Sequence, residues 1–337
     1  MSLGDQQPTD AGQNPQLIEI IFLGTGTSGR LPNVTCLTRK KVVCQTCPLA
    51  LTPEGRKNRR RNTSILARWR RANGSVFTLL VDCGKSFYES ALEWLPHFKI
   101  ERIDAVFLTH GHADAMFGLD DLRSFSTVQR MAIPIYATER TMRVVRPAFP
   151  YLVDRSKATG GGDVARLDFH IIDPENPVFI GDMKVTPLPV HHGYDDGGTP
   201  FINLGLRIDN VAYIADVNYI PDSTRKLMHG LELVVLDALK PTPFTSHFGY
   251  HQAIGECRLI GARRSLLTDF AHMLEHETMT RDLMELEQKE GIWIRPAYDG
   301  MFLTRTTALN KDADVHDWTE EPEHLDDGAI PHRLPRC

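Results

Sequence analysis

The sequence predicts an α/β protein in which helices pack on β-sheets. Short apolar runs typical of strands alternate with amphipathic helical patterns, and several strand candidates end in Asp or His. The predicted strands are residues 17–23, 76–81, 103–108, 133–137, 185–190, 202–208, 211–215, 233–236 and 265–268. The predicted helices are residues 86–96, 138–145, 252–263 and 277–289. Loops at strand ends carry the chemistry of many α/β enzymes, so the polar residues there are the candidates for function.

One folded domain is expected to account for most of the 337 residues, because a single layered α/β domain reaches this size. Residues 1–16 are polar and rich in Gly, Pro and Gln, which predicts a disordered lead-in. The domain is predicted to span residues 17–309, with an insertion at 154–168 that is poor in apolar residues. Residues 310–337 carry acidic clusters and few apolar residues, so we expect a mobile acidic tail.

Composition and charge argue against two classes of protein. With 38 basic and 43 acidic residues the net charge is −5, which does not favour a protein that binds nucleic acid over its whole surface. No stretch reaches the roughly 20 apolar residues that span a bilayer, and the N-terminal residues lack the apolar run of a secretory signal. We therefore expect a soluble cytoplasmic protein without a membrane partner, and a nuclear location stays open.

A run of metal-ligand residues follows the strand predicted at 103–108. His110 and His112 are two residues apart, so they project from one face if the strand continues, and Asp114 extends the series. Zinc binds this mixture of neutral imidazole and carboxylate, with at least one position open where the metal does catalysis. A single His is more often a surface residue than a ligand, whereas this combination after an apolar strand predicts a metal site.

Further ligands are expected at the ends of later strands. The candidates are the pair His191 and His192, then Asp216, and then Asp269 or His272. Each of them follows an apolar run that predicts a strand. The same order of strand and then ligand therefore holds throughout the chain.

The run Thr109–Asp114, read as T-H-G-H-A-D, resembles the T-H-x-H-x-D-H signature of the metallo-β-lactamase superfamily. His192, Asp216 and the strand end near His272 are similar to its remaining ligand motifs, and the resemblance covers about residues 17–305. It looks closest to the branch that contains a cyclic-phosphate phosphodiesterase, which shares the early cysteine cluster and the run P-L-P-V-H-H. The resemblance implies a four-layer αββα sandwich with the metals at the edge between two sheets.

The resemblance also implies a role for each ligand. His110, His112 and His192 would bind the first metal, Asp114 would bind the second, and Asp216 would bridge the two. Since this mixture of imidazole and carboxylate suits zinc, one or two catalytic zinc ions are expected, with manganese as a second candidate.

One position departs from the signature, because its last His is Ala115 in this chain. A methyl group cannot bind a metal, so another residue compensates, or the second metal binds weakly, or the site works with one metal. We expect His272 to complete the active site, because an imidazole is the usual ligand there. If His272 joins the cysteines instead, Asp269 is the candidate.

Three of the six cysteines lie within twelve residues, at Cys36, Cys44 and Cys47. This grouping is more typical of metal binding or redox chemistry than of disulfides. It resembles the accessory zinc site of the phosphodiesterase branch, in which three Cys and one His form a closed tetrahedron, a structural arrangement because no position is left for substrate. The fourth ligand would be His272 or His276, and the alternative is a loop of reduced cysteines.

A basic stretch, Arg56–Arg61, follows the cysteines, with Arg68, Arg70 and Arg71 beyond it. Charge runs usually form a solvated face, and this is the favoured interpretation. The alternative is a phosphate-binding patch, because the forked guanidinium matches phosphate oxygens.

The predicted function is that of a zinc-dependent hydrolase, and the leading hypothesis is a phosphodiesterase that acts on a small phosphodiester, such as a cyclic phosphate, through a metal-activated hydroxide. Asp114 and His247 are the predicted catalytic residues, with His247 as the acid that protonates the leaving group. Asp82 is expected to orient a ligand His. The alternatives are an RNA-processing endonuclease of the same fold, with nucleic acid as a less favoured partner, and a metal-binding protein without catalysis. A homodimer stays open.

Overall fold

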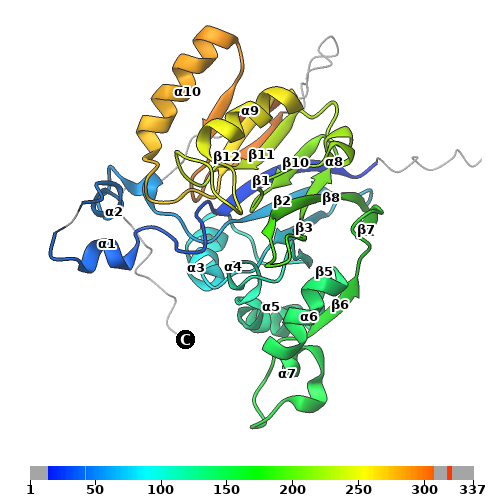
Figure 1. Ribbon diagram of the computed structural model, residues 1–337. Coiled ribbons are helices and arrows are strands. Elements are labelled where there is room, and N and C mark those ends of the chain that lie inside the picture. The colour runs from blue at the N-terminus through cyan, green and yellow to red at the C-terminus, as the bar shows by residue number, and fades with distance from the viewer. Residues whose placement is uncertain (1–13, 42, 307–316, 321–337) are drawn as a thin grey trace, which may run out of the picture.

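The computed structural model describes residues 14–41, 43–306 and 317–320, which form two β-sheets (Figure 1). In spatial order, the eight strands of the first sheet are β15 (Asp317–Glu320), β14 (Phe302–Thr306), β1 (Gln16–Gly24), β2 (Ser64–Arg70), β3 (Val76–Val81), β4 (Ala105–Phe107), β5 (Ile133–Ala137) and β6 (Leu167–Ile171). The seven strands of the second sheet are β13 (Ile294–Pro296), β12 (Arg264–Thr268), β11 (Leu233–Asp237), β10 (Val211–Ile214), β9 (Pro200–Ile208), β8 (Met183–Tyr194) and β7 (Val178–Ile180).

Each sheet is half antiparallel and half parallel. In the first sheet β1, β2 and β3 pair antiparallel, and β3 to β6 run parallel. In the second sheet β7 to β10 pair antiparallel, and β10 to β13 run parallel. Residues at the carboxyl ends of parallel strands are brought to one edge of a sheet, which is where α/β proteins place their binding sites.

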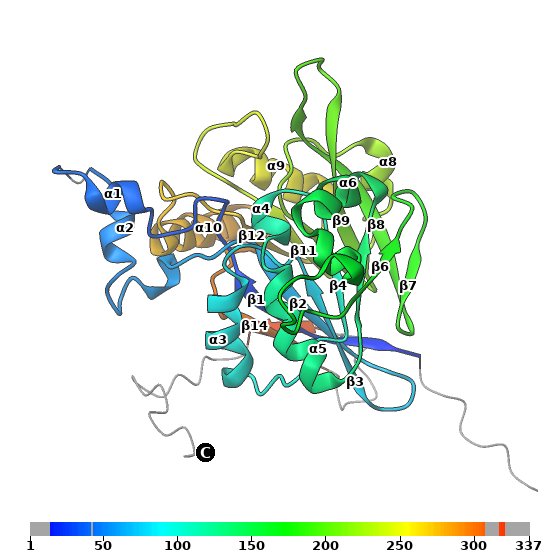
Figure 2. The same ribbon diagram turned by 90° about the horizontal axis from the view of Figure 1, so that it is seen from below.

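Helices cover the outer face of each sheet, as Figures 1 and 2 show. The first sheet is covered by α3 (Phe87–His97), α4 (Ala113–Met116), α5 (Arg123–Gln129), α6 (Glu139–Ala148) and α7 (Pro150–Val153). The second is covered by α8 (Asp222–Lys226), α9 (Tyr250–Ile260) and α10 (His276–Glu290). Two short helices, α1 (Val34–Thr38) and α2 (Thr46–Leu49), lie in the segment that carries the cysteines. The predicted four-layer αββα sandwich is confirmed.

The apolar core consists of three clusters of buried side chains, one between the two β-sheets and one between each sheet and its helices. Between the two β-sheets, Trp69 stacks on Phe77 with ring centroids 4.3 Å apart, and Tyr213 packs into the same cluster from the facing sheet. Burial of each such side chain stabilises the fold by about 1.5–3 kcal/mol. Caps then fix the helix ends: the Glu275 carboxylate accepts from two backbone N–H groups at the start of α10, and Gly291 ends that helix with a φ of 71°.

All nine predicted strands and all four predicted helices have counterparts, with ends that differ by a few residues. Strand β2 was not predicted, because Arg68 and Arg70 interrupt its apolar pattern. Arg68 is half-buried and pairs with Glu19, its partner in register on β1, so the two charges compensate one another within the sheet. Alternation of the buried Trp69 with these cations is the signal that marks this strand.

The predicted insertion at 154–168 and the predicted C-terminal tail agree only in part with the structure. Residues 154–166 contain one short 3-10 turn, Arg155–Lys157, before β6 begins at Leu167. Within the predicted tail, Asp317–Glu320 form β15 against β14, which differs from the expected mobile segment at these four positions. The lead-in at 1–13 and the rest of the tail lie outside the described residues. No helix in the described ranges has both the length and the apolar character needed to cross a membrane.

We predict that Tyr213→Phe raises the free energy of unfolding by about 1 kcal/mol, because the Tyr213 hydroxyl is buried and has no hydrogen-bond partner in the described part of the chain. Denaturant unfolding measures this change, with Tyr219→Phe as the control variant. Tyr219 is 46% exposed, so its substitution should change stability by less than about 0.5 kcal/mol. A loss of stability in Tyr213→Phe would contradict the prediction.

Candidate metal centre

Ligand-type side chains gather at the carboxyl ends of parallel strands in both sheets. Asp82 and His110 follow β3 and β4, while Asp216, Asp237 and Asp269 stand at the ends of β10, β11 and β12. The backbone of three of these aspartates, at positions 82, 216 and 269, has φ of 60°, 52° and 69°. Asp enters this left-handed region more readily than most residues. The chain therefore turns sharply at the end of each strand and leaves a carboxylate at the edge.

His110, His112 and His192 form a compact set that we call the three-histidine group. One ring nitrogen from each lies within 4.8 Å of the other two. The His192 Nδ1 donates to the Ser246 carbonyl oxygen at 2.7 Å, which leaves its Nε2 free. Burial, helped by neighbouring His rings, lowers the pKa of His110 well below its usual value and that of His192 to about 4. The rings are therefore neutral, which is the form that binds a metal ion.

A hydrogen-bonded chain from Asp82 sets the tautomer of His110. Thr109 donates to the Asp82 carboxylate from its backbone N at 2.9 Å and from its hydroxyl at 2.8 Å. Because that hydroxyl has a single proton, it accepts from His110 Nδ1, which lies 2.9 Å away. The lone pair of His110 is thus on Nε2, which is buried and has no partner among the described residues. Asp82 therefore orients His110 through Thr109.

His247 lies beside the three-histidine group, between three carboxylates. Its Nδ1 is 2.8 Å from Asp237 Oδ2 and 3.3 Å from Asp269 Oδ2, and its Nε2 is 3.9 Å from Asp216 Oδ1. Burial alone would lower the pKa of His247, but Asp237 and Asp269 outweigh it and raise the pKa above its usual value. The same Asp216 oxygen is 3.7 Å from His192 Nε2. Asp216 therefore joins His247 to the three-histidine group.

Asp114 and Ala115 lie in the first turn of α4, directly after His112. Asp114 is half-buried and belongs to none of the clusters in which three or more potential ligand atoms of the described residues lie within 4.8 Å of one another. Ala115 is buried, and its carbonyl oxygen accepts from Cys83 N at 2.7 Å. The structure thus places a predicted catalytic residue and metal ligand, Asp114, near the centre but outside its tightest ligand groups.

Cys36, Cys44, Cys47 and His272 form a second compact set, which we call the cysteine group. All four potential ligand atoms lie within 4.8 Å of one another, with His272 Nδ1 at 3.0 Å from Cys36 Sγ and 3.7 Å from Cys47 Sγ. The expectation that His272 completes the active site is therefore corrected. His272 follows Asp269 by three residues in a loop that turns away from the sheet edge, so its ring faces the cysteines while Asp269 faces His247.

His276, the other candidate for the cysteine group, lies elsewhere. It is the first residue of α10, its backbone N donates to Asn58 Oδ1 at 2.8 Å, and its ring meets Tyr298 edge-on. Burial and nearby Arg60 lower the pKa of its ring to about 3. His276 joins neither the cysteine group nor the three-histidine group within the described chain.

The basic stretch is only partly a solvated face. Arg59 is exposed and Arg61 pairs with Glu93, whereas Arg60 is fully buried. The Arg60 guanidinium donates to the carbonyl oxygens of Ala271 at 3.3 Å and Leu274 at 2.8 Å. It therefore holds the loop that carries Asp269 and His272, a role that neither interpretation of the sequence includes.

A family comparison identifies the chain. The beta-lactamase superfamily domain matches residues 78–270, which is more than half of the chain and contains the three-histidine group, Asp216, Asp237, His247 and Asp269. The chain belongs to the metallo-β-lactamase superfamily. A solved structure of a diphosphatase from the PhnP family is 28% identical, with a TM-score of 0.69, over 86% of this chain and 98% of that chain. The resemblance predicted from the sequence is confirmed, and the chain has the metallo-β-lactamase fold.

Two relatives of this metallo-β-lactamase chain carry different names. An octanoyltransferase from Porphyromonas gingivalis is 28% identical over 313 residues, which cover 92% of this chain and 56% of that protein. A ribonuclease Z from Methanopyrus kandleri is 28% identical over 151 residues, which cover 44% of this chain and 47% of that protein. The chain thus spans about half the length of these two relatives.

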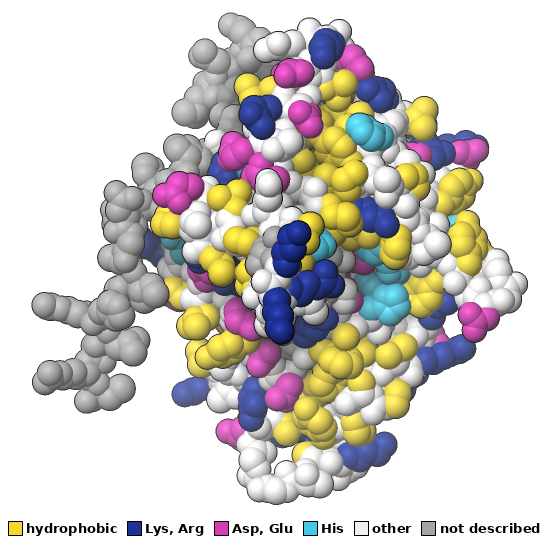
Figure 3. Space-filling model, turned by 60° about the vertical axis from the view of Figure 1, so that its left-hand side comes forward, with side chains coloured by type: hydrophobic (Ala, Val, Ile, Leu, Met, Phe, Trp, Pro, Cys, Tyr) yellow, Lys and Arg dark blue, Asp and Glu magenta, His cyan; other side chains and the backbone are white. Residues whose placement is uncertain are grey.

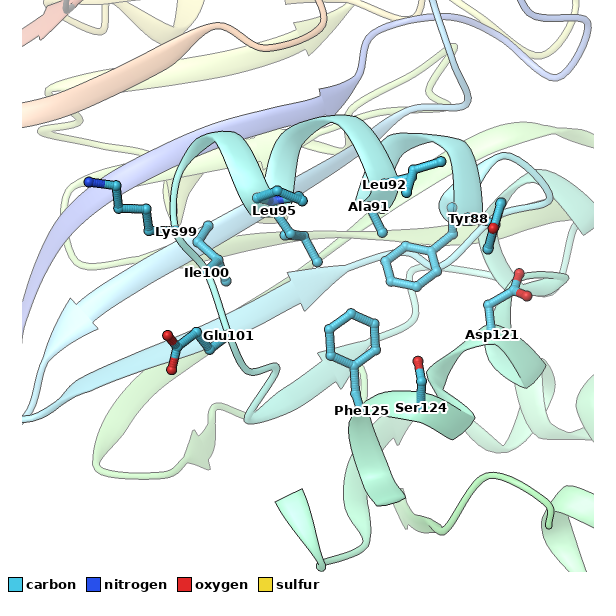
Figure 4. A pocket seen from close by; sticks show the side chains of 12 residues that line it. Tyr88, Ala91, Leu92, Leu95, Lys99, Ile100, Glu101, Asp121, Ser124 and Phe125 are labelled. Carbon is cyan, nitrogen blue, oxygen red and sulfur yellow. The ribbon is translucent and has the colours of Figure 1, made fainter. Parts of the chain in front are cut away.

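The outer helices of the metallo-β-lactamase fold also form a hollow of about 510 Å³ between α3 and α5 (Figure 4). Its walls are largely apolar and include Phe87, Leu95 and Phe125, with Lys99 and Asp121 at opposite ends in the view. None of its lining residues belongs to the ligand groups. The hollow is therefore separate from the ligand groups at the sheet edge.

Sequence reasoning missed some residues around the metallo-β-lactamase centre. Asp237 was not singled out, although it ends a predicted strand as Asp216 nearly does. Phe201 stacks on His112 with ring centroids 4.9 Å apart, and the Arg140 guanidinium lies 4.4 Å from the Phe201 ring centroid. Asp237 could have been found from its place at a strand end, whereas the stacked pair carries no sequence signal.

We predict that Arg60→Met lowers the free energy of unfolding by about 3 kcal/mol, because it leaves the carbonyl groups of Ala271 and Leu274 without their buried donor. The matched control is Arg59→Met, an exposed neighbour whose Nε donates to one carbonyl, and it should lose less than about 1 kcal/mol. Denaturant unfolding of both variants provides the measurement. Equal losses in the two variants would show that Arg60 has no special role.

Proposed function

We propose that the chain is a zinc-dependent phosphodiesterase that hydrolyses a small phosphodiester. The observation that carries this proposal is the approach of the three-histidine group, Asp216 and His247 to one another at the edge between the sheets. Together they offer ligands for a divalent metal and an adjacent proton donor, which is the equipment that hydrolysis of a phosphate ester requires.

The donor set fits a metal ion. His110 Nε2 is buried and has no hydrogen-bond partner among the described residues, and the Nε2 of its neighbour His192 lies 3.7 Å from Asp216 Oδ1. With His112 they make three neutral imidazoles and one carboxylate, the ligand types that zinc prefers. Manganese remains the second candidate. When bound here, the ion would lower the pKa of a water molecule and offset charge that develops on the phosphoryl oxygens.

His247 is proposed to protonate the leaving oxygen. Asp237 holds its Nδ1 at 2.8 Å, so the ring is fixed and Nε2 faces the Asp216 side of the centre. The raised pKa of His247 favours the imidazolium form at neutral pH, so a proton is present on the side that faces the substrate. Asp237 and Asp269 act through His247 and therefore position it.

Two cation and aromatic pairs flank this centre and are proposed to bind the phosphate. Arg140 packs on Phe201, which stacks on His112, while the Lys240 ammonium lies 4.3 Å from the ring centroid of Phe244, a neighbour of His247. In the face shown in Figure 3, Lys and Arg side chains gather close to surface His side chains. An anionic substrate would thus meet positive charge on both sides of the metal ligands.

A small phosphodiester is favoured over RNA. The similar diphosphatase supports a phosphorus centre as the point of attack. An RNA endonuclease is supported by the ribonuclease Z relative, but that similarity covers less than half of this chain. The basic stretch also offers little to a long nucleic acid, because Arg60 is buried and Arg61 is paired with Glu93.

The cysteine group is proposed to hold a structural zinc ion. Three thiols and an imidazole within 4.8 Å of one another offer the four ligands of a closed zinc site, which would leave no position for substrate. The ion would tie the segment with α1 and α2 to the loop after β12. Within the group only His272 lies on that loop, three residues beyond Asp269, so the proposed ion would stabilise the path of the loop.

We predict that His110→Ala lowers metal-dependent hydrolysis of bis-p-nitrophenyl phosphate by about 100-fold or more, since the metal contributes several kcal/mol to the transition state. A chelator should abolish wild-type turnover, and added zinc should restore it. The matched control is His229→Ala, an exposed His after α8, which should keep full activity. Wild-type protein that binds zinc without hydrolysing phosphodiesters would instead support a metal-binding protein.

We predict that Cys44→Ser removes one zinc ion per chain and lowers the melting temperature, because zinc in a closed site contributes directly to folding. Metal at the three-histidine group should remain. The control is Cys257→Ala, which removes a buried thiol of α9 that lies outside both groups and should leave the zinc count unchanged. Elemental analysis with calorimetric melting provides the readout, and an unchanged zinc count in Cys44→Ser would contradict the assignment.

A further inference from the structure

We infer that the catalytic centre holds a single metal ion, bound by the three-histidine group and Asp216, and that the network of Asp237, His247 and Asp269 closes the side where a second ion would lie. The inference rests on the proposed function, because it concerns the same centre. In two-metal sites the ions lie roughly 3.5–4 Å apart and share a bridging ligand, which here would be Asp216. A second ion therefore needs further ligands next to Asp216.

Asp269 lies next to Asp216, but its oxygens already serve the chain. Asp269 Oδ2 accepts from the backbone N of Asp216 at 3.1 Å and lies 3.3 Å from His247 Nδ1. Asp269 Oδ1 lies 3.1 Å from the Thr63 hydroxyl. All of these groups are buried, so turning Asp269 toward a metal would leave the Asp216 N–H without an acceptor. Asp269 is therefore held as a structural acceptor.

The other side of Asp216 offers too few ligands. Ala115 carries no donor atom, and Asp114 is half-buried and lies outside the 4.8 Å grouping that joins Asp216 to His192 and His247. His192 already belongs to the three-histidine group. A second ion would have only Asp114 and the shared Asp216 carboxylate as protein ligands, with water in its remaining positions. Each protein ligand that water replaces weakens the binding of the ion.

His247 is the strongest rival as a second-metal ligand. Its Nε2 is 3.9 Å from Asp216 Oδ1, close enough for the two atoms to share an ion. However, its ring is clamped at Nδ1 by Asp237, and no third ligand atom beyond His192 comes within 4.8 Å of this pair in the described chain. The ring of His247 lies 4.9 Å from the ring of His192, so it stands between the Asp216 carboxylate and the side chain of Asp237.

The test counts zinc ions per chain by elemental analysis and native mass spectrometry after dialysis against micromolar zinc. We expect two ions in the wild type, one at each group, and the same two in Asp114→Asn. The double variant Ala115→His with Asp269→His should bind a third zinc ion. If this variant does not fold, the zinc count of Asp114→Asn tests the inference by itself. Three ions in the wild type would overturn the inference.

Loss of one ion in Asp114→Asn or in His247→Ala would also overturn it, because either result identifies a catalytic-ion ligand outside the three-histidine group and Asp216. His110→Ala serves as the reference, since it should remove the single catalytic ion and leave the cysteine group loaded. Hydrolysis is measured separately on the same preparations. A centre with one ion that does not hydrolyse phosphodiesters would overturn the proposed function and leave the single-ion inference intact.

Discussion

The centre depends on the burial of four carboxylates at one edge of the sandwich: Asp82, Asp216, Asp237 and Asp269 are each no more than 7% exposed. Burial raises the pKa of Asp82 to about 8 and that of Asp237 to about 7, and burial with the Asp269 charge raises that of Asp216. Carboxylates held this close ionise together only when positive charge lies among them. His247 supplies part of it, and a divalent ion at the three-histidine group would supply the rest.

Much of this edge is predictable from the sequence, because each strand there is a short apolar run and the residue after it is polar. His110, His192 and Asp216 stand out for that reason. Asp237 obeys the same rule, but an Asp at a strand end carries no sign of its partner. His247 reaches it from a loop ten residues later, and only the path of that loop brings the two side chains within 2.8 Å.

The side on which His272 lies was not predictable, because it depends on tertiary contacts of an irregular loop. Asp269 has a left-handed backbone, and the loop beyond it is held by a buried Arg60 from a distant segment. In the sequence Arg60 is one cation in a run of charges, and nothing local distinguishes it from its exposed neighbour Arg59. Its burial follows from the carbonyl groups that it satisfies, which belong to residues more than 200 positions away.

The same loop couples the two metal groups. Asp269 accepts from the backbone N of Asp216 beside the three-histidine group, and His272, three residues later, faces the cysteines. A zinc ion at the cysteine group would therefore fix the loop at one end, while Arg60 holds its carbonyl groups in the middle. Loss of either constraint would let Asp269 move. Asp269 is one of the two carboxylates that contact His247 Nδ1, so that contact would weaken. A loaded cysteine group would thus support the proposed centre by keeping an acceptor in place, although it lies outside the centre itself.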